Sequence, residues 1–185
     1  GKGVVKIKFN YQKAEAPAPV VHDVKSPIEV GDATLTVDGA EVVYLPLKDA
    51  NKGEGFSKDP VLKIAFTIKN NGGEAITYEP GHLSAGQGLA PALLEDGGSG
   101  RYMRARFGAD REVTGQVGVR STIDAGKTQK DFAVFERPPK TIKNLMFQLP
   151  GRLFGQTGLI RVRVPYTYAD PAKPKALNPG GGDDK

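Results

Sequence analysis

The sequence contains no cysteine and only two histidines, and these shortages exclude several kinds of protein. Without thiolates the chain cannot form disulfides, zinc–thiolate sites or iron–sulfur clusters, and it cannot use a cysteine nucleophile. The compartment stays open on this ground, because an oxidising environment permits disulfides without requiring them. No motif indicates a cofactor.

Long apolar runs are also missing. No stretch approaches the roughly 18 to 20 residues that a membrane helix needs, so we expect no membrane span in this chain. No signal peptide with its apolar core is visible. The chain begins at Gly1 rather than at methionine, which favours a processed or trimmed N-terminus and leaves open whether a signal or anchor has been removed.

Glycine and proline are abundant, at 24 and 14 of 185 residues, and indicate a fold with many turns. The hydrophobic content of 38% is enough for one core. We predict a tether over residues 1–27, with one possible strand at Val4–Phe9 ahead of an Ala/Pro-rich stretch. Residues 28–168 form the predicted domain, and residues 169–185 a disordered tail.

Between these ends the hydrophobic pattern has a period of two. Ala33–Val37 and Glu41–Leu45 flank Asp38-Gly39, a turn signal that predicts a β-hairpin. Asn70 to Gly73 predicts another turn. No helical period reaches ten residues, and we expect about eight or nine strands, typical of a sandwich or barrel. Further candidate strands lie at 61–69, 75–78, 101–107, 113–119, 128–135, 143–149 and 159–168.

The alternation also predicts the core. Leu62, Ile64, Phe66 and Ile68 share one face of a strand, while Lys63 and Lys69 point to water. The same two-residue spacing recurs in later strands that a sandwich would place opposite or beside this one. The residues with this spacing are Phe132, Val134, Val162 and Val164. We expect most of the eight residues in the two groups to be buried together.

Four landmarks resemble a family of bacterial extracytoplasmic immunoglobulin-like domains of unknown function, related to secreted immunoprotective antigens and found in lipoproteins and membrane-tethered proteins. They are Val30-Gly31-Asp32, the segment Ile64–Gly72, the segment Leu94–Tyr102 and the segment Ile123–Glu136. The resemblance covers roughly residues 28–168 and implies an all-β, immunoglobulin-like antiparallel β-sandwich located outside the cytoplasm. It supplies no catalytic residues.

Positive charge is concentrated in one part of the chain. Residues 1–100 carry 10 Lys/Arg against 13 Asp/Glu, whereas residues 101–165 carry 13 against 5. This half could attract an anion, or its arginines could simply keep strand surfaces soluble. As a strand, 101–107 would turn Tyr102, Arg104 and Arg106 to solvent, and Arg101, Met103, Ala105 and Phe107 to the core. The candidate anion-binding residues are Arg101, Arg104, Arg106 and Arg111.

Pro80 to Gly100 has the composition of a long loop with a short strand or turn inside it, around the apolar stretch Leu89 to Leu94, and loops often carry function. Its candidate partner-binding residues are His82, Leu89, Leu93 and Leu94. Calcium binding at Glu95 and Asp96 is left open, although the pattern lacks the spaced carboxylates of an EF-hand loop. An enzyme would require His82 to converge with Glu95 or Asp96.

Two glycine-containing segments resemble nucleotide-binding motifs only superficially. Ala125–Thr128 ends like a phosphate-binding loop, but Ser121 stands where its first glycine belongs and a strand follows. Gly86–Pro91 lacks the third glycine of a dinucleotide fingerprint. We interpret the first as a turn and dismiss the second.

The sequence therefore predicts a non-catalytic extracytoplasmic interaction or structural module of the cell envelope, periplasmic, secreted or at the cell surface. Its partner would be an envelope protein, peptide or glycan. The alternative is a β-domain that binds anions, nucleic acid or acidic polysaccharide, through its basic face, with nucleic acid the less favoured ligand. We expect no enzymatic activity.

Overall fold

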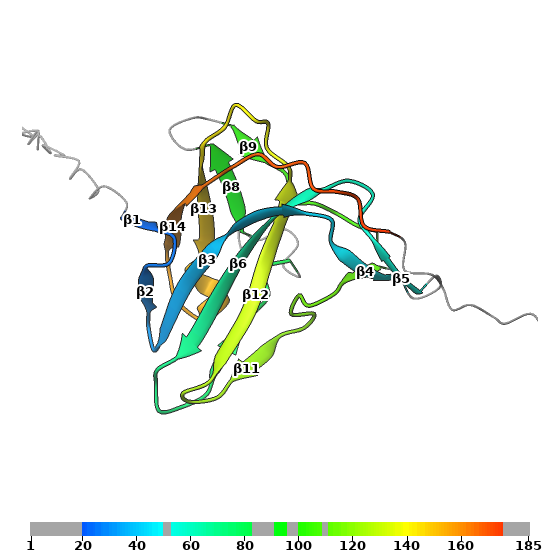
Figure 1. The fold of residues 1–185 in the computed structure, drawn as a ribbon. Helices are drawn as coiled ribbons and strands as arrows, with labels where there is room; N and C mark the ends of the chain where they lie inside the picture. The colour runs from blue at the N-terminus through cyan, green and yellow to red at the C-terminus, as the bar shows by residue number, and fades with distance from the viewer. Residues whose placement is uncertain (1–19, 50–52, 83–90, 96–99, 109–110, 176–185) are drawn as a thin grey trace, which may run out of the picture.

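The computed structural model describes residues 20–49, 53–82, 91–95, 100–108 and 111–175, and its largest regular element is a four-stranded antiparallel sheet (Figure 1). Alternating apolar residues suit β6 to its place as one of the two inner strands, and five buried hydrophobic side chains lie along it. In spatial order the sheet consists of β12 (Thr128–Glu136), β6 (Val61–Asn70), β3 (Ala33–Val43) and β2 (Pro27–Val30).

A second, five-stranded sheet packs against the first. All its neighbouring strands are antiparallel except the first pair, which is parallel. In spatial order it consists of β1 (Val21–Asp23), β14 (Leu159–Pro165), β13 (Asn144–Pro150), β8 (Ala92–Glu95) and β9 (Arg101–Tyr102).

Two smaller sheets and one 3-10 turn complete the described part of the chain. The first small sheet has the order β10 (Arg111–Val113), β4 (Pro46–Asp49) and β5 (Gly53–Phe56). The second pairs β7 (Ile76–Tyr78) with β11 (Ser121–Ile123). The 3-10 turn η1 spans Gly151–Phe154.

The main core fills the space between the two large sheets. Phe147 of β13 meets Phe66 of β6 and Phe135 of β12, with ring centroids 6.4 and 6.1 Å apart. The predicted all-β antiparallel sandwich is confirmed. The strands are more numerous than expected, fourteen in the described residues, because several contain only two to four residues.

The expected core residues are all buried, but they do not form one cluster. In β12, Ala133 and Phe135 pair with Ile64 and Leu62 and face the main core. Phe132 and Val134 point to the opposite face of the sheet. Six of the eight expected residues are thus buried together, as predicted, and these two are the exceptions. Both faces of β12 are covered, and alternation cannot tell one covered face from the other. The cluster on this outer face contains Leu45, Leu47, Val61, Phe132 and Val134.

The predicted hairpin at Asp38-Gly39 is also wrong. These residues lie within the continuous strand β3, where the register to β6 shifts between Val37 and Gly39. Gly39 has φ of +153°, which suits a bulge in a strand as well as a turn. The Asp38 carboxylate accepts a 2.8 Å hydrogen bond from Thr67 Oγ1, so the side chain is held across the strand pair. Pairing with the ten-residue β6 on both sides of the bulge keeps the strand continuous.

Two predicted turns are confirmed. Asn70 ends β6, and its buried side chain donates hydrogen bonds to the carbonyl oxygens of Glu74 and Ile123 at 2.7 and 2.8 Å. Asp124 to Lys127 forms a turn in which Lys127 N–H donates to Asp124 O at 3.0 Å, and β12 follows directly. The segment that resembled a phosphate-binding loop is thus a connection between strands.

Both ends of the predicted domain have further contacts. Strand β1 adds part of the expected tether to the five-stranded sheet. Arg137 donates to Ala169 O and Asp170 Oδ1 at 3.1 and 2.9 Å, which attaches the start of the expected tail. The possible strand Val4–Phe9 lies outside the described residues. Within the described residues, no helix has the length and apolar character required to cross a bilayer.

Candidate functional site

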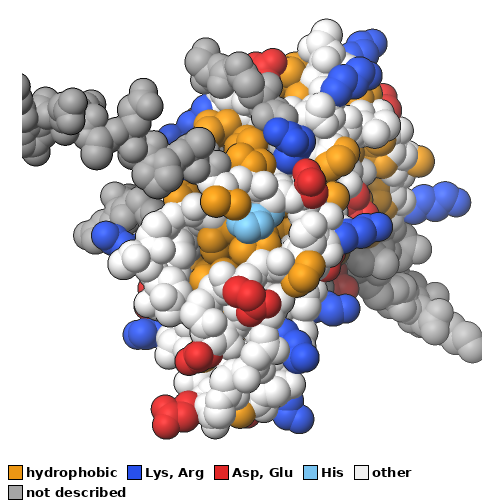
Figure 2. Space-filling model, turned by 90° about the vertical axis from the view of Figure 1, so that its left-hand side faces the viewer, with side chains coloured by type: hydrophobic (Ala, Val, Ile, Leu, Met, Phe, Trp, Pro, Cys, Tyr) orange, Lys and Arg blue, Asp and Glu red, His pale blue; other side chains and the backbone are white. Residues whose placement is uncertain are grey.

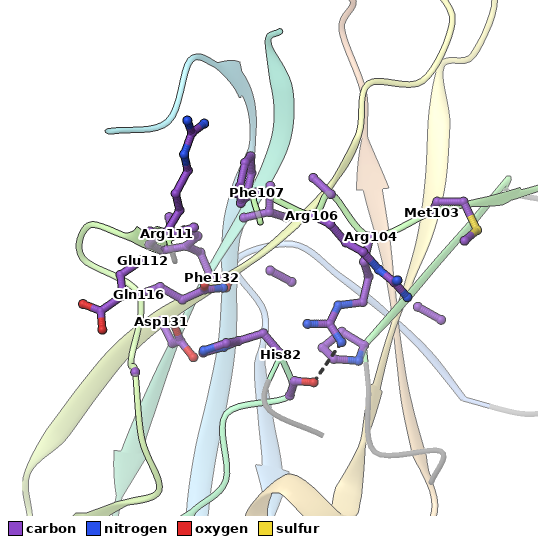
Figure 3. A pocket seen from close by; sticks show the side chains of 18 of the residues that line it. His82, Met103, Arg104, Arg106, Phe107, Arg111, Glu112, Gln116, Asp131 and Phe132 are labelled. Atoms are coloured by element: carbon purple, nitrogen blue, oxygen red, sulfur yellow. Dashed lines mark hydrogen bonds between the residues drawn. The ribbon is translucent and has the colours of Figure 1, made fainter. Parts of the chain in front are cut away.

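An open depression of about 1310 Å³ lies between the β8–β9 end of one sheet and the edge strand β12 of the other. Among the described residues, strand β12 has no regular partner strand on this side, and segments 101–108 and 111–119 line the opening instead (Figure 3). The depression has apolar, cationic and acidic side chains in its wall. Such mixed, concave surfaces are where ligands usually bind.

At the base lies a buried pair formed by Tyr78 and Asp131. Tyr78, 1% exposed, donates its phenolic hydrogen to Asp131 Oδ2 at 2.5 Å. Burial and the neighbouring carboxylate raise the pKa of Tyr78, so the hydroxyl stays protonated and acts as the donor. Tyr78 also stacks on Phe154, with ring centroids 5.9 Å apart.

Asp131 is held by more than this hydroxyl. Val117 N–H donates to its second oxygen, Oδ1, at 3.1 Å. Burial raises the pKa of Asp131, although hydrogen bonds from Tyr78, Val117 and Phe132 favour the ionised form. Gln116 beside it donates from Nε2 to Phe132 O at 2.8 Å and so covers part of the open edge of β12. The carboxylate is fixed in position by its neighbours.

His82 extends toward Asp131 from the opposite side of the depression (Figure 3). The imidazole is half-buried. Burial lowers the pKa of His82, the Asp131 charge acts against this, and the charge of Arg104 lowers it further. The histidine is therefore neutral at pH 7 and can donate or accept a hydrogen bond.

Arg104 lies in the wall next to His82. Its Nη1 donates to Gly81 O at 3.1 Å, the contact drawn as a dashed line in Figure 3. Burial lowers the pKa of Arg104, and the like charge of Arg106 lowers it further. Among the described residues, no ion pair involves either guanidinium. Two cations thus share the wall without a carboxylate between them.

The expected division of segment 101–107 into a solvent face and a core face is wrong. The regular strand ends at Tyr102. The segment then crosses to β12, where the backbone of Arg104 forms an isolated antiparallel β-bridge with the backbone of Phe135. Ala105 N–H donates to Val134 O at 3.1 Å, which stabilises the crossing. Met103 is consequently 59% exposed, whereas Arg104 is turned inward.

The other two predicted arginines are in different environments. Arg111 lines the depression but binds Asp49 through Nε at 3.1 Å, so its charge is compensated. Arg101 is exposed at the rim. The structure therefore brings all four predicted arginines and His82 to one depression, and distinguishes Arg104 and Arg106 from the paired Arg111.

The short strand allowed for within the Pro80–Gly100 segment is β8, and it makes part of the predicted partner-binding surface unavailable. Leu93 is fully buried in β8, paired with Phe147 of β13, and cannot contact a partner. Leu94 is in the same strand and half-buried. The reason is that two neighbouring strands complete the pairing of β8, a tertiary contact that composition does not reveal. Leu89 lies outside the described residues.

The described residues also bear on calcium and on catalysis. Glu95 is the last residue of β8, and Asp96 lies outside the described residues. Within the described ranges, no group of three or more histidine or acidic side chains is placed to hold a metal ion. His82 faces Asp131 rather than Glu95, so the carboxylate that accompanies it differs from those the sequence suggested.

Sequence reasoning missed Asp131 and Tyr78 as parts of the site. A signal was present, because Asp131, Ala133 and Phe135 alternate on one face of a strand, and an acid within such a series is unusual. The predicted core face of this strand is the one that carries Phe132 and Val134, so the sequence analysis did not single out Asp131.

The surface around these elements combines apolar and charged groups. Figure 2 shows a face on which apolar side chains surround a histidine, with acidic and basic side chains close by. Near the depression, Met103 and Val119 are 59% and 70% exposed and line its opening. Exposed apolar groups beside charged ones are typical of binding surfaces.

Comparisons with known proteins agree with the fold. No family model matches the chain, and the curated proteins contain no match. The yjhA protein from Bacillus subtilis is similar in structure, with a TM-score of 0.51 and 14% identity, over 77% of this chain and 99% of that protein. An uncharacterized beta-sandwich protein from Clostridium difficile 630 aligns with a TM-score of 0.48 and 14% identity, over 83% and 99%. At this identity the likeness to yjhA concerns the fold alone, and the chain is a β-sandwich protein.

Proposed function

We propose that this chain is a non-catalytic interaction module of the cell envelope, which binds a protein, peptide or glycan in the depression beside β12. The observation that carries the proposal is the open concave surface of about 1310 Å³, with apolar and charged side chains together in its wall. Exposed Met103 and Val119 at the opening supply the apolar contact that a partner would cover.

The non-catalytic character is supported by the state of Asp131. Both of its carboxylate oxygens already accept hydrogen bonds, one from Tyr78 and one from Val117. These two contacts tie the carboxylate to Tyr78 and to segment 111–119, which fixes its position at the base of the depression. Asp131 therefore acts as a structural group that holds the base of the depression, and His82 beside it serves as a polar contact for the ligand.

The proposed location outside the cytoplasm, and the immunoglobulin-like family, are supported by the motifs quoted above. Val30-Gly31-Asp32 forms the tight turn from β2 to β3, where Gly31 has φ of +60°. The Asn70-Asn71-Gly72 landmark closes β6, where Asn71 N–H donates to Asp32 O at 2.8 Å. The two landmarks thus contact each other at one end of the sandwich.

The test is binding of the full chain to an array that holds peptidoglycan fragments, acidic and neutral oligosaccharides, and a peptide library. The Val119→Asp variant places a charge at the opening. Val20→Asp is its matched control, because both valines are 70% exposed and Val20 does not line the depression. We expect Val119→Asp to lose the binding that wild type and Val20→Asp share. Equal binding by all three proteins would overturn the proposed site.

A further inference from the structure

Arg104 is a half-buried cation in the wall of the depression, and most of its hydrogen-bond donors are not used in the described contacts. Its guanidinium has five N–H donors, and the described contacts use one of them, on Gly81 O. The side chain is half-buried, and burial together with Arg106 disfavours its charge. An anion bound here would favour the charged form of Arg104, because it would pair with the positive charge and accept hydrogen bonds from the remaining N–H groups.

Arg106 extends the same positive region toward solvent. It is exposed and near enough to Arg104 to lower the pKa of Arg104 by charge repulsion. Both side chains come from the short crossing segment between β9 and β12, and Figure 3 shows them side by side. Two neighbouring guanidinium groups can together surround one carboxylate, since each offers parallel donors in a planar fork.

The opposite wall has a different chemistry. Glu112 and Gln116 line it, and Gln116 uses its Nε2 hydrogen on Phe132 O, which leaves the amide oxygen as an acceptor. Acceptors on this side suit ligand hydroxyl groups. The rings of Phe107 and Tyr102 also line the depression and provide apolar surface. The depression therefore offers donors for an anion, acceptors for hydroxyls, and a flat apolar contact.

A nucleic acid fits this arrangement less well. Phosphate recognition uses several cations along a track, and each carries part of the affinity. Here Arg111 is already paired with Asp49 at 3.1 Å, and Glu112 and Asp131 would face a second phosphate. A ligand with one carboxylate on a hydroxyl-rich ring can accept hydrogen bonds from the arginines and donate hydrogen bonds to Glu112 and Gln116.

We propose that the depression binds an acidic glycan, with the carboxylate of a uronic acid residue held by Arg104 and Arg106. This assignment rests on the proposed function, because it names the ligand class of the same site.

The test uses the full chain and three soluble probes: oligogalacturonate, its fully methyl-esterified form, and single-stranded DNA, each titrated calorimetrically at low and moderate salt. We expect oligogalacturonate to bind and the neutral ester to bind at least about tenfold more weakly, since a charge-assisted pair is lost. The DNA should bind more weakly than oligogalacturonate at both salt concentrations.

Three variants locate the site. Arg106→Gln and Arg104→Lys should each weaken oligogalacturonate binding by about tenfold, the second because lysine keeps the charge but lacks the planar fork. Arg152→Gln is the control, since Arg152 is exposed in η1 and does not line the depression. It should bind as wild type does. Arg106 is exposed, so its substitution leaves the fold intact.

Equal binding of the acid and its ester, tighter binding of DNA, or unchanged binding by both arginine variants would each overturn the glycan assignment. These results are distinguishable from failure of the proposed function. If a peptide or neutral glycan binds to wild type but not to Val119→Asp, the depression is a binding site and the acidic ligand alone is wrong.

Discussion

Replacement of Phe66 by alanine tests the sandwich most directly. Phe66 is 2% exposed in β6, which has β3 and β12 as its two neighbours. Its ring contacts Phe147 of the opposite sheet, with 6.4 Å between the centroids. The substitution thus removes an aromatic contact that joins the two large sheets, and it leaves both backbone ladders in place.

The expected loss follows from the surroundings of the ring. Truncation of a buried phenylalanine to alanine costs about 3 to 5 kcal/mol, and the cost grows with the empty volume that remains. Phe66 also lines the depression, so the space vacated by the ring would open toward solvent. We therefore expect a cost near the lower limit, about 3 kcal/mol, which is a large part of a typical domain stability of about 5 to 15 kcal/mol.

Urea denaturation measures this difference. With a slope of about 2 kcal/mol per molar urea, a loss of about 3 kcal/mol lowers the midpoint by about 1.5 M. Lys69→Ala is the control from the same strand, since Lys69 is exposed, and it should change stability by no more than about 0.5 kcal/mol. A Phe66→Ala midpoint within about 0.3 M of wild type, at an unchanged slope, would refute the assignment of β6 to the core.

Three further predictions concern polar contacts. Lys63 is predicted from the sequence to point to water, but its Nζ binds the Glu41 carboxylate at 2.8 Å and lies 5.0 Å from the ring centre of Phe132. Lys63→Ala should therefore lower the free energy of unfolding in urea by about 0.5 to 1.5 kcal/mol. A cost no larger than that of the exposed-lysine control would contradict this. Tyr78→Phe removes the hydroxyl that Asp131 accepts and should cost about 1 to 3 kcal/mol at pH 7. Stability equal to wild type would show that the hydroxyl adds nothing. Burial raises the pKa of Asp131 above 3.8, so the folded state binds the carboxyl proton more tightly than the unfolded state does. The stability that this proton contributes is fully present below pH 3.8 and is lost as pH rises through the folded-state pKa. Unfolding measured from pH 3 to 7 should therefore show wild type losing stability relative to Asp131→Asn, and parallel pH profiles would contradict the shift.

The amino-acid sequence alone determined the strands that carry the core. Alternation marks β6, β13 and β14 clearly, because each has one apolar face and each lies within three residues of its predicted bounds. The turns at Asn70 and Gly126 were equally readable, since local backbone chemistry favours them whatever surrounds them. The concentration of arginine after residue 100 also pointed to the right segment for the site.

Tertiary structure alone decided which of two possible faces or partners each ambiguous segment uses. Asp38-Gly39 is compatible with a turn or a bulge, and the long partner strand β6 selects the bulge. Both faces of β12 are apolar, and its register with β6 places Asp131 toward the depression and Phe132 on the outer face. Arg104 turns inward because its segment leaves β9 and bridges Phe135, a residue 31 positions away in the sequence. A period of two defines two faces for every strand, but which face is buried depends on what packs there, and those contacts come from distant parts of the chain.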